Sequence, residues 1–167
     1  MIVKGKVFKF GDDINTDGII SGRYKFTITD MKELAHYIFE DIRPNFYKEL
    51  TPGKSIIVAG ENFGMGSSRE QAPWVIKESG ISCVVAKSFA RIFYRNSFNI
   101  GLSLVEADTS SLKEKDHISI DFSQGIIKND KTGETIEFLP WDSFREELVT
   151  SGGILNYLKK HKGFKTL

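Results

Sequence analysis

The sequence predicts an α/β fold, a small parallel core sheet with additional β-strands on either side. Three observations lead to this prediction. Two short apolar runs, residues 55–59 and 82–86, have the length of strands buried on both faces. The segment between them repeats apolar side chains at helical spacing, which makes a βαβ unit. After residue 105 the pattern changes to short pieces separated by turn residues, which is typical of antiparallel strands.

Length and charge narrow the class of protein. The chain has 167 residues, the usual size of one domain, so residues 1–167 are expected to form a single domain. The 23 basic residues balance 22 acidic ones, which leaves no broad positive field for nucleic acid or an anionic membrane, and neither is expected as a partner. The 13 phenylalanines fit either a large core or an apolar interface through which unpartnered chains self-associate.

The N-terminal residues predict a strand followed by a shaped loop. Residues 1–10 alternate apolar and basic side chains, as a half-buried strand does. They hold no apolar stretch typical of a signal peptide, and no segment approaches a membrane span, so a cytoplasmic protein is expected. Residues 11–18 are rich in Asp, Asn and Gly, which favour turns shaped by side-chain hydrogen bonds.

Four helices are expected along the chain. Asp30 precedes an amphipathic run that predicts a helix over about residues 30–41. Apolar residues at helical spacing predict a second helix between the two core strands, and Gly80 ends it. Ser88 is expected to cap a third helix over residues 89–98. The fourth, C-terminal helix is expected over about residues 152–161, with lysines and a histidine near its C-terminal end.

The most informative stretch is residues 60–74, where a strand runs into a Gly-x-Gly turn and then into a helix. Free backbone N–H groups and the positive end of a helix dipole meet there, which predicts an anion site. Arg69 adds a planar guanidinium suited to a carboxylate. A small acidic substrate fits better than a nucleotide, because Arg69 stands where the dinucleotide fingerprint has its third glycine.

A purely structural explanation of this stretch stands beside the chemical one. Ser67 and Glu70 also have the spacing of a capping box, a common device at helix starts. Pro73 would then lie inside the helix, where it removes the hydrogen bond to the Arg69 carbonyl. In that case the helix either starts late or has an irregular first turn.

A second group of candidate residues lies near the N-terminus. Asp17 is an acidic side chain on a glycine-flanked loop, suited to relaying protons in a cleft, whereas the local sequence favours an Asx turn at Asn15. Arg23 alone is typical of solvated surface. Arg91 and Arg95, one helical turn apart, form either a surface face or part of a contact with carboxylates.

No metal site is expected in this chain. Cys83 is its one cysteine and lies in an apolar run, which predicts a core residue. A disulfide, a thiolate zinc site and a complete iron–sulfur ligand set all need more thiolates than that. The histidines His36, His117 and His161 lack the spacing of metal ligands. A cofactor of these kinds would have to come from a partner.

Four motifs occur in order over nearly the whole chain: GDDINTD at residues 11–17, GRY at 22–24, GENFGMGSSRE at 60–70 and KSFARIFYRN at 87–96. Together they resemble the small subunits of 3-isopropylmalate dehydratase and its homoaconitase relatives, which are counterparts of the swivelling C-terminal domain of aconitase. The resemblance implies a swivel-type β/β/α fold and a place in leucine and branched-chain amino-acid biosynthesis.

The resemblance also implies an activity. It implies a hydro-lyase that isomerises 3-isopropylmalate and 2-isopropylmalate by dehydration and rehydration through an unsaturated diacid. The enzyme is a heteromer whose large subunit supplies a [4Fe-4S] cluster with an open iron that acts as a Lewis acid. This chain binds no cofactor of its own and is active only with that partner.

The motif match assigns roles to individual residues. By the resemblance, Ser67 is the general base that takes the proton from the carbon beside a carboxylate, and Asp17 belongs to the acid/base network. By the same resemblance, Arg69 binds a substrate carboxylate, and Ser68 and Gly66 assist in substrate binding. A serine is a poor base unless its alkoxide is stabilised, which a helix N-terminus and a nearby arginine would provide.

Substrate choice in the family lies in the loop after the Gly-Arg-Tyr element, which places Arg23, Lys25 and Phe26 among the substrate-binding residues. Phe26 stands where relatives that act on longer tricarboxylates carry an arginine, which favours a branched aliphatic group. Lys25 could serve an extra carboxylate, so citramalate, dimethylmalate and homoaconitate stay open as alternatives. Met65 and Gln71 depart from the Cys and His that many bacterial members carry.

Two other functions were weighed against the hydro-lyase. In the first, the turn at residues 66–70 holds a small dicarboxylate in a non-catalytic binding module that regulates or scaffolds a partner. The second is a stand-alone hydrolase that uses Ser67 as its nucleophile. It is disfavoured, because none of the three histidines lies in a context that indicates a triad partner.

Overall fold

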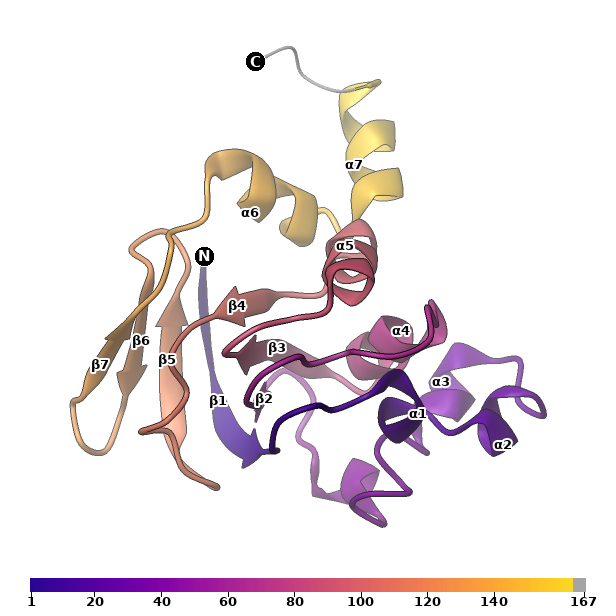
Figure 1. The fold of residues 1–167 in the computed structure, drawn as a ribbon. Coiled ribbons are helices and arrows are strands. Elements are labelled where there is room, and N and C mark those ends of the chain that lie inside the picture. The colour runs from indigo at the N-terminus through magenta and orange to yellow at the C-terminus, as the bar shows by residue number, and fades with distance from the viewer. Residues whose placement is uncertain (164–167) are drawn as a thin grey trace.

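The computed structural model describes residues 1–163, in which seven strands form one curled sheet with most of the helices beside its parallel half (Figure 1). The strand order is β4-β3-β2-β1-β5-β6-β7. The strands are β1 (Ile2–Lys9), β2 (Ser55–Val58), β3 (Ile81–Ala86), β4 (Leu104–Glu106), β5 (His117–Asp121), β6 (Ile126–Asn129) and β7 (Thr135–Glu137). β1 to β4 pair in parallel, and β5 to β7 pair antiparallel.

The expected parallel core and the expected meander are both confirmed, but not the placement of added strands on either side. β1 pairs in parallel with β2 and antiparallel with β5. It therefore belongs to the parallel half, and all the antiparallel additions lie beyond it on one side of the sheet. β2 and β3, the inner strands of the parallel half, are almost entirely buried, as their continuous apolar sequences predict.

The helices of the described chain are α1 (Thr16–Ile19), α2 (Gly22–Lys25), α3 (Met31–Ala35), η1 (Phe46–Glu49), α4 (Gln71–Glu78), α5 (Arg91–Ile100), α6 (Ser143–Thr150) and α7 (Ile154–His161). α3 packs on α4, α4 on α5, and α5 on both α6 and α7. α4 connects β2 to β3 and completes the expected βαβ unit. α7 lies within the range expected for the C-terminal helix and ends at the expected residue, whereas α1, α2, η1 and α6 were not predicted.

The helix expected over residues 30–41 is shorter than predicted. Asp30 caps it as expected, accepting a hydrogen bond from Glu33 N at 2.8 Å. The helix ends at Ala35, because the chain turns so that Phe39 adopts a φ of 55°. The Phe39 N–H donates to Ile19 O at 2.9 Å, and its ring is fully buried. A contact with a distant segment therefore overrides the local helical pattern.

The helix expected over residues 89–98 begins two residues later, and Ser88 does not cap it. Ala90 is the N-cap residue of α5 and makes no side-chain capping bond. The Ser88 hydroxyl instead accepts from Asn62 N at 2.8 Å and donates to Glu61 Oε2 at 2.9 Å. It thus holds the loop that follows β2.

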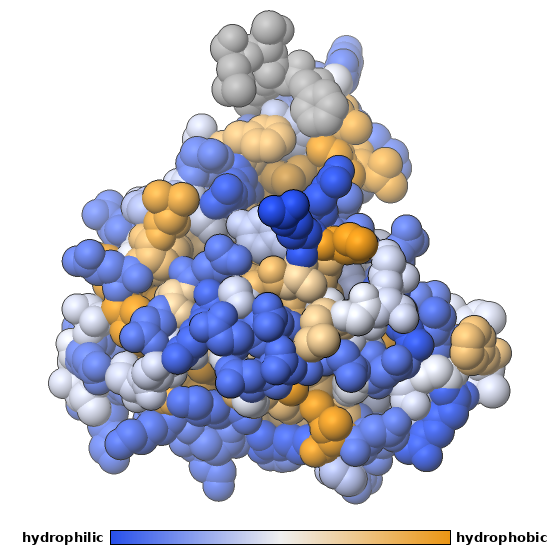
Figure 2. Space-filling view, in the orientation of Figure 1, coloured by the Kyte–Doolittle hydropathy of each residue, from blue (hydrophilic) through white to orange (hydrophobic). Residues whose placement is uncertain are grey.

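Most of the phenylalanine content belongs to the core. Within residues 1–163 seven phenylalanines are buried, namely Phe8, Phe39, Phe46, Phe63, Phe93, Phe98 and Phe122. Many of these rings contact one another. The face seen in Figure 2 is largely hydrophilic, with hydrophobic side chains scattered over it and gathered near α7. No helix among residues 1–163 is long and apolar enough to cross a membrane.

Candidate active site

The candidate site lies where β1 and β2 end, because the pairing of these parallel strands continues into the loops that follow them. Residues 11–16 run alongside residues 60–65. Within the described chain, four backbone hydrogen bonds join the two segments: Gly60 N to Gly11 O (3.1 Å), Asp13 N to Glu61 O (2.8 Å), Gly64 N to Ile14 O (2.7 Å) and Thr16 N to Met65 O (2.9 Å). We call these four bonds the loop ladder. It fixes the course of the loop after β2.

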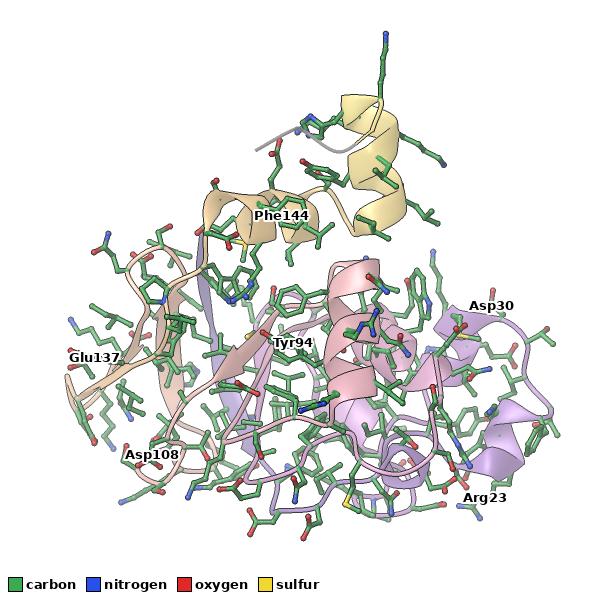
Figure 3. The ribbon with its side chains drawn as sticks, turned by 45° about the horizontal axis from the view of Figure 1, so that its top comes forward. Arg23, Asp30, Tyr94, Asp108, Glu137 and Phe144 are labelled. Atoms are coloured by element: carbon green, nitrogen blue, oxygen red, sulfur yellow. The ribbon has the colours of Figure 1, made fainter. Side chains whose placement is uncertain are left out.

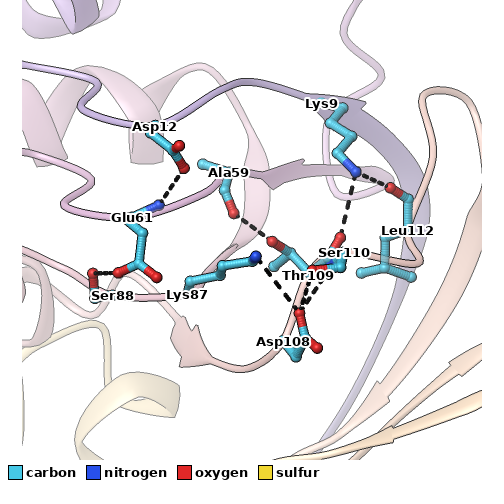
Figure 4. Close-up of polar contacts among 10 residues, drawn as sticks. All are labelled: Lys9, Asp12, Ala59, Glu61, Lys87, Ser88, Asp108, Thr109, Ser110 and Leu112. Atoms are coloured by element: carbon cyan, nitrogen blue, oxygen red, sulfur yellow. Dashed lines mark hydrogen bonds and ion pairs between the residues drawn. The ribbon is translucent and has the colours of Figure 1, made fainter.

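Side chains reinforce the loop ladder. The Asp12 carboxylate accepts a hydrogen bond from Glu61 N at 2.8 Å, and the Glu61 carboxylate in turn accepts from the Ser88 hydroxyl (Figure 4). The Asn62 amide donates to Asp13 Oδ1 at 3.0 Å. The acidic and amide side chains of the first loop therefore act as hydrogen-bond partners of the second loop.

Two glycines let the loop pass through a crowded place. Gly64 has a φ of +82°, and a Cβ built on it would lie 2.2 Å from Cγ of Phe93, a buried ring on α5. Gly66 has a φ of +92°. Only glycine adopts such backbone angles at low cost, and only glycine leaves room for the Phe93 ring.

Beyond the glycines, the structure brings Arg69 and Asp17 together. Arg69 Nη1 forms an ion pair with Asp17 Oδ1 and also lies 3.4 Å from the carbonyl oxygen of Ile20. The Arg69 side chain is 15% exposed, whereas that of Asp17 is 58% exposed. Asn15 accepts a hydrogen bond from Gly18 N at 2.7 Å, so the Asx-type turn and the acidic site residue occur together.

A cavity of about 310 Å³ opens beside this pair. Its lining includes three of the predicted residues on the loop, Gly66, Ser67 and Ser68, together with Arg69. The side chains of Ser67 and Ser68 are exposed. A second cavity, of about 330 Å³, lies on the other side of Asn96, towards α7. We assign the site to the first cavity, because it gathers the serine hydroxyls and the guanidinium.

The capping box predicted at Ser67 and Glu70 is wrong. α4 begins at Gln71, with Glu70 as an N-cap residue that makes no side-chain capping bond. The late start places Pro73 in the first turn, where a missing N–H leaves no intrahelical hydrogen bond unmade. The expectation that Ser67 sits directly on a helix N-terminus is corrected as well, because the helix starts four residues further on.

The three residues predicted to choose the substrate, Arg23, Lys25 and Phe26, do not line the cavity. They lie on α2 and at its C-terminal end. A Cβ on Gly22 would lie 3.5 Å from the Phe26 ring and 4.0 Å from Arg69 Nη1, so α2 adjoins the guanidinium. Phe26 is nevertheless 81% exposed, with Lys25 Nζ 5.4 Å from its ring centre. Arg23 forms an ion pair with Asp41 and lies at the rim of the molecule (Figure 3).

Two polar residues of the cavity lining, Thr16 and Asn96, were not singled out from the sequence, and for Arg91 a contact with carboxylates was one of two alternatives. Thr16 is buried beneath the loop, and Arg91 and Asn96 line the cavity from α5. Their motifs were visible, since Thr16 precedes Asp17 and both α5 residues belong to the run at 87–96. The sequence did not predict that the N-terminal end of α5 packs against the loop. The close approach of Phe93 to Gly64 shows this packing in the structure.

Residues 1–163 offer no ligand set for an iron–sulfur cluster. Cys83 is fully buried in β3, and burial raises the pKa of its thiol. Over residues 1–163 there is no group of three or more His, Cys, Asp or Glu side chains placed to hold a metal ion. A thiol held neutral inside a sheet is a core residue, as its sequence context predicted.

Comparisons with known proteins agree with the fold and with the motifs. Residues 13–109 match the aconitase C-terminal domain family. The chain is 47% identical to 3-isopropylmalate dehydratase small subunit 1 of Thermotoga maritima, over 98% of each chain. It is 50% identical to the small subunit from Brachyspira hyodysenteriae, over 98% of this chain and all of that one. A crystal structure of 3-isopropylmalate dehydratase from Methanocaldococcus jannaschii superposes with a TM-score of 0.90, at 48% identity over 97% of this chain and 96% of that one.

The close approach at Gly64 predicts a large loss of stability in Gly64→Ala. The new methyl group would need a left-handed backbone, costing about 1–2 kcal/mol, and would overlap the Phe93 ring, costing about 1–3 kcal/mol more. Gly133→Ala is the matched control, because Gly133 has a φ of +76° and open space around its Cβ position. Urea unfolding should show the larger loss for Gly64→Ala. Equal losses would contradict the packing described for the loop.

Proposed function

The chain belongs to the family of 3-isopropylmalate dehydratase small subunits, and we propose that it is one subunit of a hydro-lyase that interconverts 3-isopropylmalate and 2-isopropylmalate. The reaction removes water from adjacent carbons of the hydroxy acid. It then adds water back to the resulting unsaturated diacid with the hydroxyl on the other carbon.

One observation carries this proposal: Ser67 and Arg69 line one cavity, with Asp17 paired to Arg69. The reaction needs a group that holds a carboxylate and a group that removes a proton from the carbon beside it. A guanidinium and a hydroxyl on neighbouring residues meet both needs. They stand within residues 60–74, and the chain matches a 3-isopropylmalate dehydratase small subunit over nearly its full length.

Arg69 is proposed to bind a substrate carboxylate. Its guanidinium is held from one side by Asp17 and Ile20 O, which leaves further N–H groups for a ligand, since a guanidinium carries five donors. A carboxylate that accepts two parallel N–H bonds is held in a defined orientation. Asp17 keeps the guanidinium in place and belongs to the acid/base network.

Ser67 is proposed to be the general base. Its hydroxyl oxygen, as the alkoxide, would accept the proton from the carbon beside the bound carboxylate, and would return it in the hydration step. The positive charge of Arg69, two residues away, lowers the cost of the alkoxide. Arg91 lines the same cavity and adds to that field, while the N–H groups of Gly66 and Ser68 lie on the same loop.

The other half of the site is proposed to come from a large subunit. A [4Fe-4S] cluster in that subunit would supply a Lewis acid for the departing hydroxyl. The residues of this chain do not fit the cluster, so it is assigned to the partner. The exposed side chains of Ser67 and Ser68, beside an open cavity, are consistent with a surface that a partner completes.

Substrate choice is proposed to lie with Phe26, Lys25 and Arg23. Phe26 is 81% exposed, which is an unfavourable place for a phenyl ring unless something covers it. In the assembled enzyme the ring would pack on the branched aliphatic group of isopropylmalate. Lys25 lies beside the ring, and for that reason citramalate, dimethylmalate and homoaconitate are the substrates to compare.

The proposal predicts turnover only in a two-subunit mixture. This chain is combined with a large subunit whose cluster has been reconstituted anaerobically, and the unsaturated diacid is followed by ultraviolet absorbance. We expect absorbance to rise with 3-isopropylmalate in the mixture and with neither protein alone. If a complex that is demonstrably assembled and loaded turned over none of the four acids, the hydro-lyase proposal would be wrong. Dicarboxylate binding by this chain alone would then favour the non-catalytic module.

Removal of the proposed base and of the carboxylate ligand should give different kinetics. Ser67→Ala is expected to lower kcat by about 10²–10⁴-fold without loss of assembly. Arg69→Lys is expected mainly to raise KM, by about tenfold or more, because a lysine gives one charged bond where arginine gives two. Ser143→Ala and Arg145→Lys, both on α6 and away from the cavity, are the matched controls and should leave both constants unchanged. A Ser67→Ala enzyme with a near-normal kcat would remove serine from the mechanism.

Phe26→Arg should move substrate preference towards the tricarboxylate. An arginine there would add a cation for a third carboxylate and remove the apolar surface for the isopropyl group. We expect the ratio of kcat/KM for homoaconitate to that for 3-isopropylmalate to rise by about tenfold or more. Phe144→Arg, at another partly exposed phenylalanine, is the control. An unchanged ratio would assign substrate choice to residues of the partner.

A further inference from the structure

Thr16 occupies a special place beneath the site loop. It is 3% exposed and makes two contacts with the loop, one from its backbone and one from its side chain. Its N–H donates to Met65 O at 2.9 Å, as the last bond of the loop ladder. Its hydroxyl donates to Ser67 O at 2.8 Å. The two bonds therefore hold the loop on both sides of Gly66.

Gly66 is the point where such a hold is needed. It has a φ of +92° and no side chain, so its own structure restrains its backbone little. A rotation there would carry Ser67 with it. α4 begins only at Gln71, so Ser67 lies outside the helix and its backbone has no helical hydrogen bond. Over residues 1–163, the hydrogen bond from the Thr16 hydroxyl is the one bond to the Ser67 backbone.

The same turn of chain also holds Arg69. Asp17, the next residue, forms the ion pair with Arg69, and Ile20 O lies 3.4 Å from Arg69 Nη1. The turn is itself fixed by the Asn15 side chain on Gly18 N. Thr16 and Asp17, neighbours in one turn, thus hold the Ser67 backbone and the Arg69 guanidinium. The proposed reaction assigns the proton to the first of these residues and the carboxylate to the second.

We infer that Thr16 is a positioning residue for this reaction, an inference that rests on the proposed function. Its hydroxyl sets the distance between the Ser67 hydroxyl and a carboxylate bound to Arg69, without touching the substrate. A displacement of about 1 Å between reacting groups can lower a rate by about 10²-fold. A threonine suits this task, since its β-branch restricts χ1 and so limits the directions open to the hydroxyl.

A competing explanation is that the hydroxyl only satisfies a buried polar group. The chain offers a matched control for it. Thr109 is 2% exposed, and its hydroxyl donates to a backbone carbonyl, Ala59 O, at the same distance of 2.8 Å (Figure 4). It lies away from the Ser67 cavity. Loss of the same bond at Thr109 therefore measures the structural effect alone.

The experiment compares Thr16→Val and Thr109→Val in the two-subunit enzyme, with thermal unfolding of each chain beside the kinetics. We expect a similar fall in Tm for both variants. For Thr16→Val we expect kcat to fall about 10- to 100-fold with a smaller change in KM, whereas Thr109→Val keeps the kcat of the unsubstituted enzyme. Thr16→Ser retains the hydroxyl and should restore most of the rate. Thr16→Ala serves as a second hydroxyl-free variant should valine not fit.

A second readout needs no activity. Amide hydrogen exchange of residues 64–69 in the chain alone should become faster in Thr16→Val and stay unchanged in Thr109→Val. A normal kcat in Thr16→Val and Thr16→Ala, or an equal loss in Thr109→Val, would overturn the inference. If the unsubstituted enzyme were inactive on every acid, the proposed function would fail by itself. The exchange result would then decide whether Thr16 holds the loop in place, and unchanged exchange would overturn that part of the inference.

Discussion

The loop ladder is the constraint on which the site depends. β1 and β2 are parallel neighbours, so their carboxyl ends leave the sheet side by side, and open parallel sheets bind ligands at such edges. In this chain the pairing persists for several residues after both strands have ended. The two loops are thereby held together. Residues from positions near 15 and near 67 meet as a result.

This arrangement explains the composition of both loops. The first contains Asp, Asn and Thr because their side chains accept or donate the bonds that backbone groups outside a sheet still require. The second contains glycines where it passes close to α5 and where it turns towards α4. The proposed functional groups then occupy the remaining positions, Asp17 on one loop and Ser67 and Arg69 on the other.

Most of the strands and the position of the site loop could be predicted from the sequence, because they rest on local patterns. The order of the strands in the sheet could not. Apolar runs and helical spacing predicted β2, α4 and β3, and turn residues predicted the meander. The boundaries that failed are those decided by distant contacts. Phe39 leaves the helical path to bond Ile19, and Ser88 bonds the loop after β2 instead of capping α5. No local pattern contains those partners.

The candidate site was predicted in the same uneven way. Ser67, Arg69 and Asp17 came from motifs, and their proximity followed only once the parallel pairing of the two loops was known. Thr16 looks like an ordinary turn residue in the sequence, because its partner, the Ser67 carbonyl, lies 51 residues away. The same holds for Arg91 and Asn96, which reach the cavity through the packing of α5.

In the proposed enzyme, this chain supplies one wall of an active site that a large subunit completes. The most direct test is a crystal structure of the assembled enzyme with a non-reacting diacid analogue. We expect a carboxylate on the Arg69 guanidinium, the Ser67 hydroxyl beside the adjoining carbon, and the partner over the exposed loop. A diacid bound elsewhere, with Ser67 and Arg69 facing solvent, would contradict it.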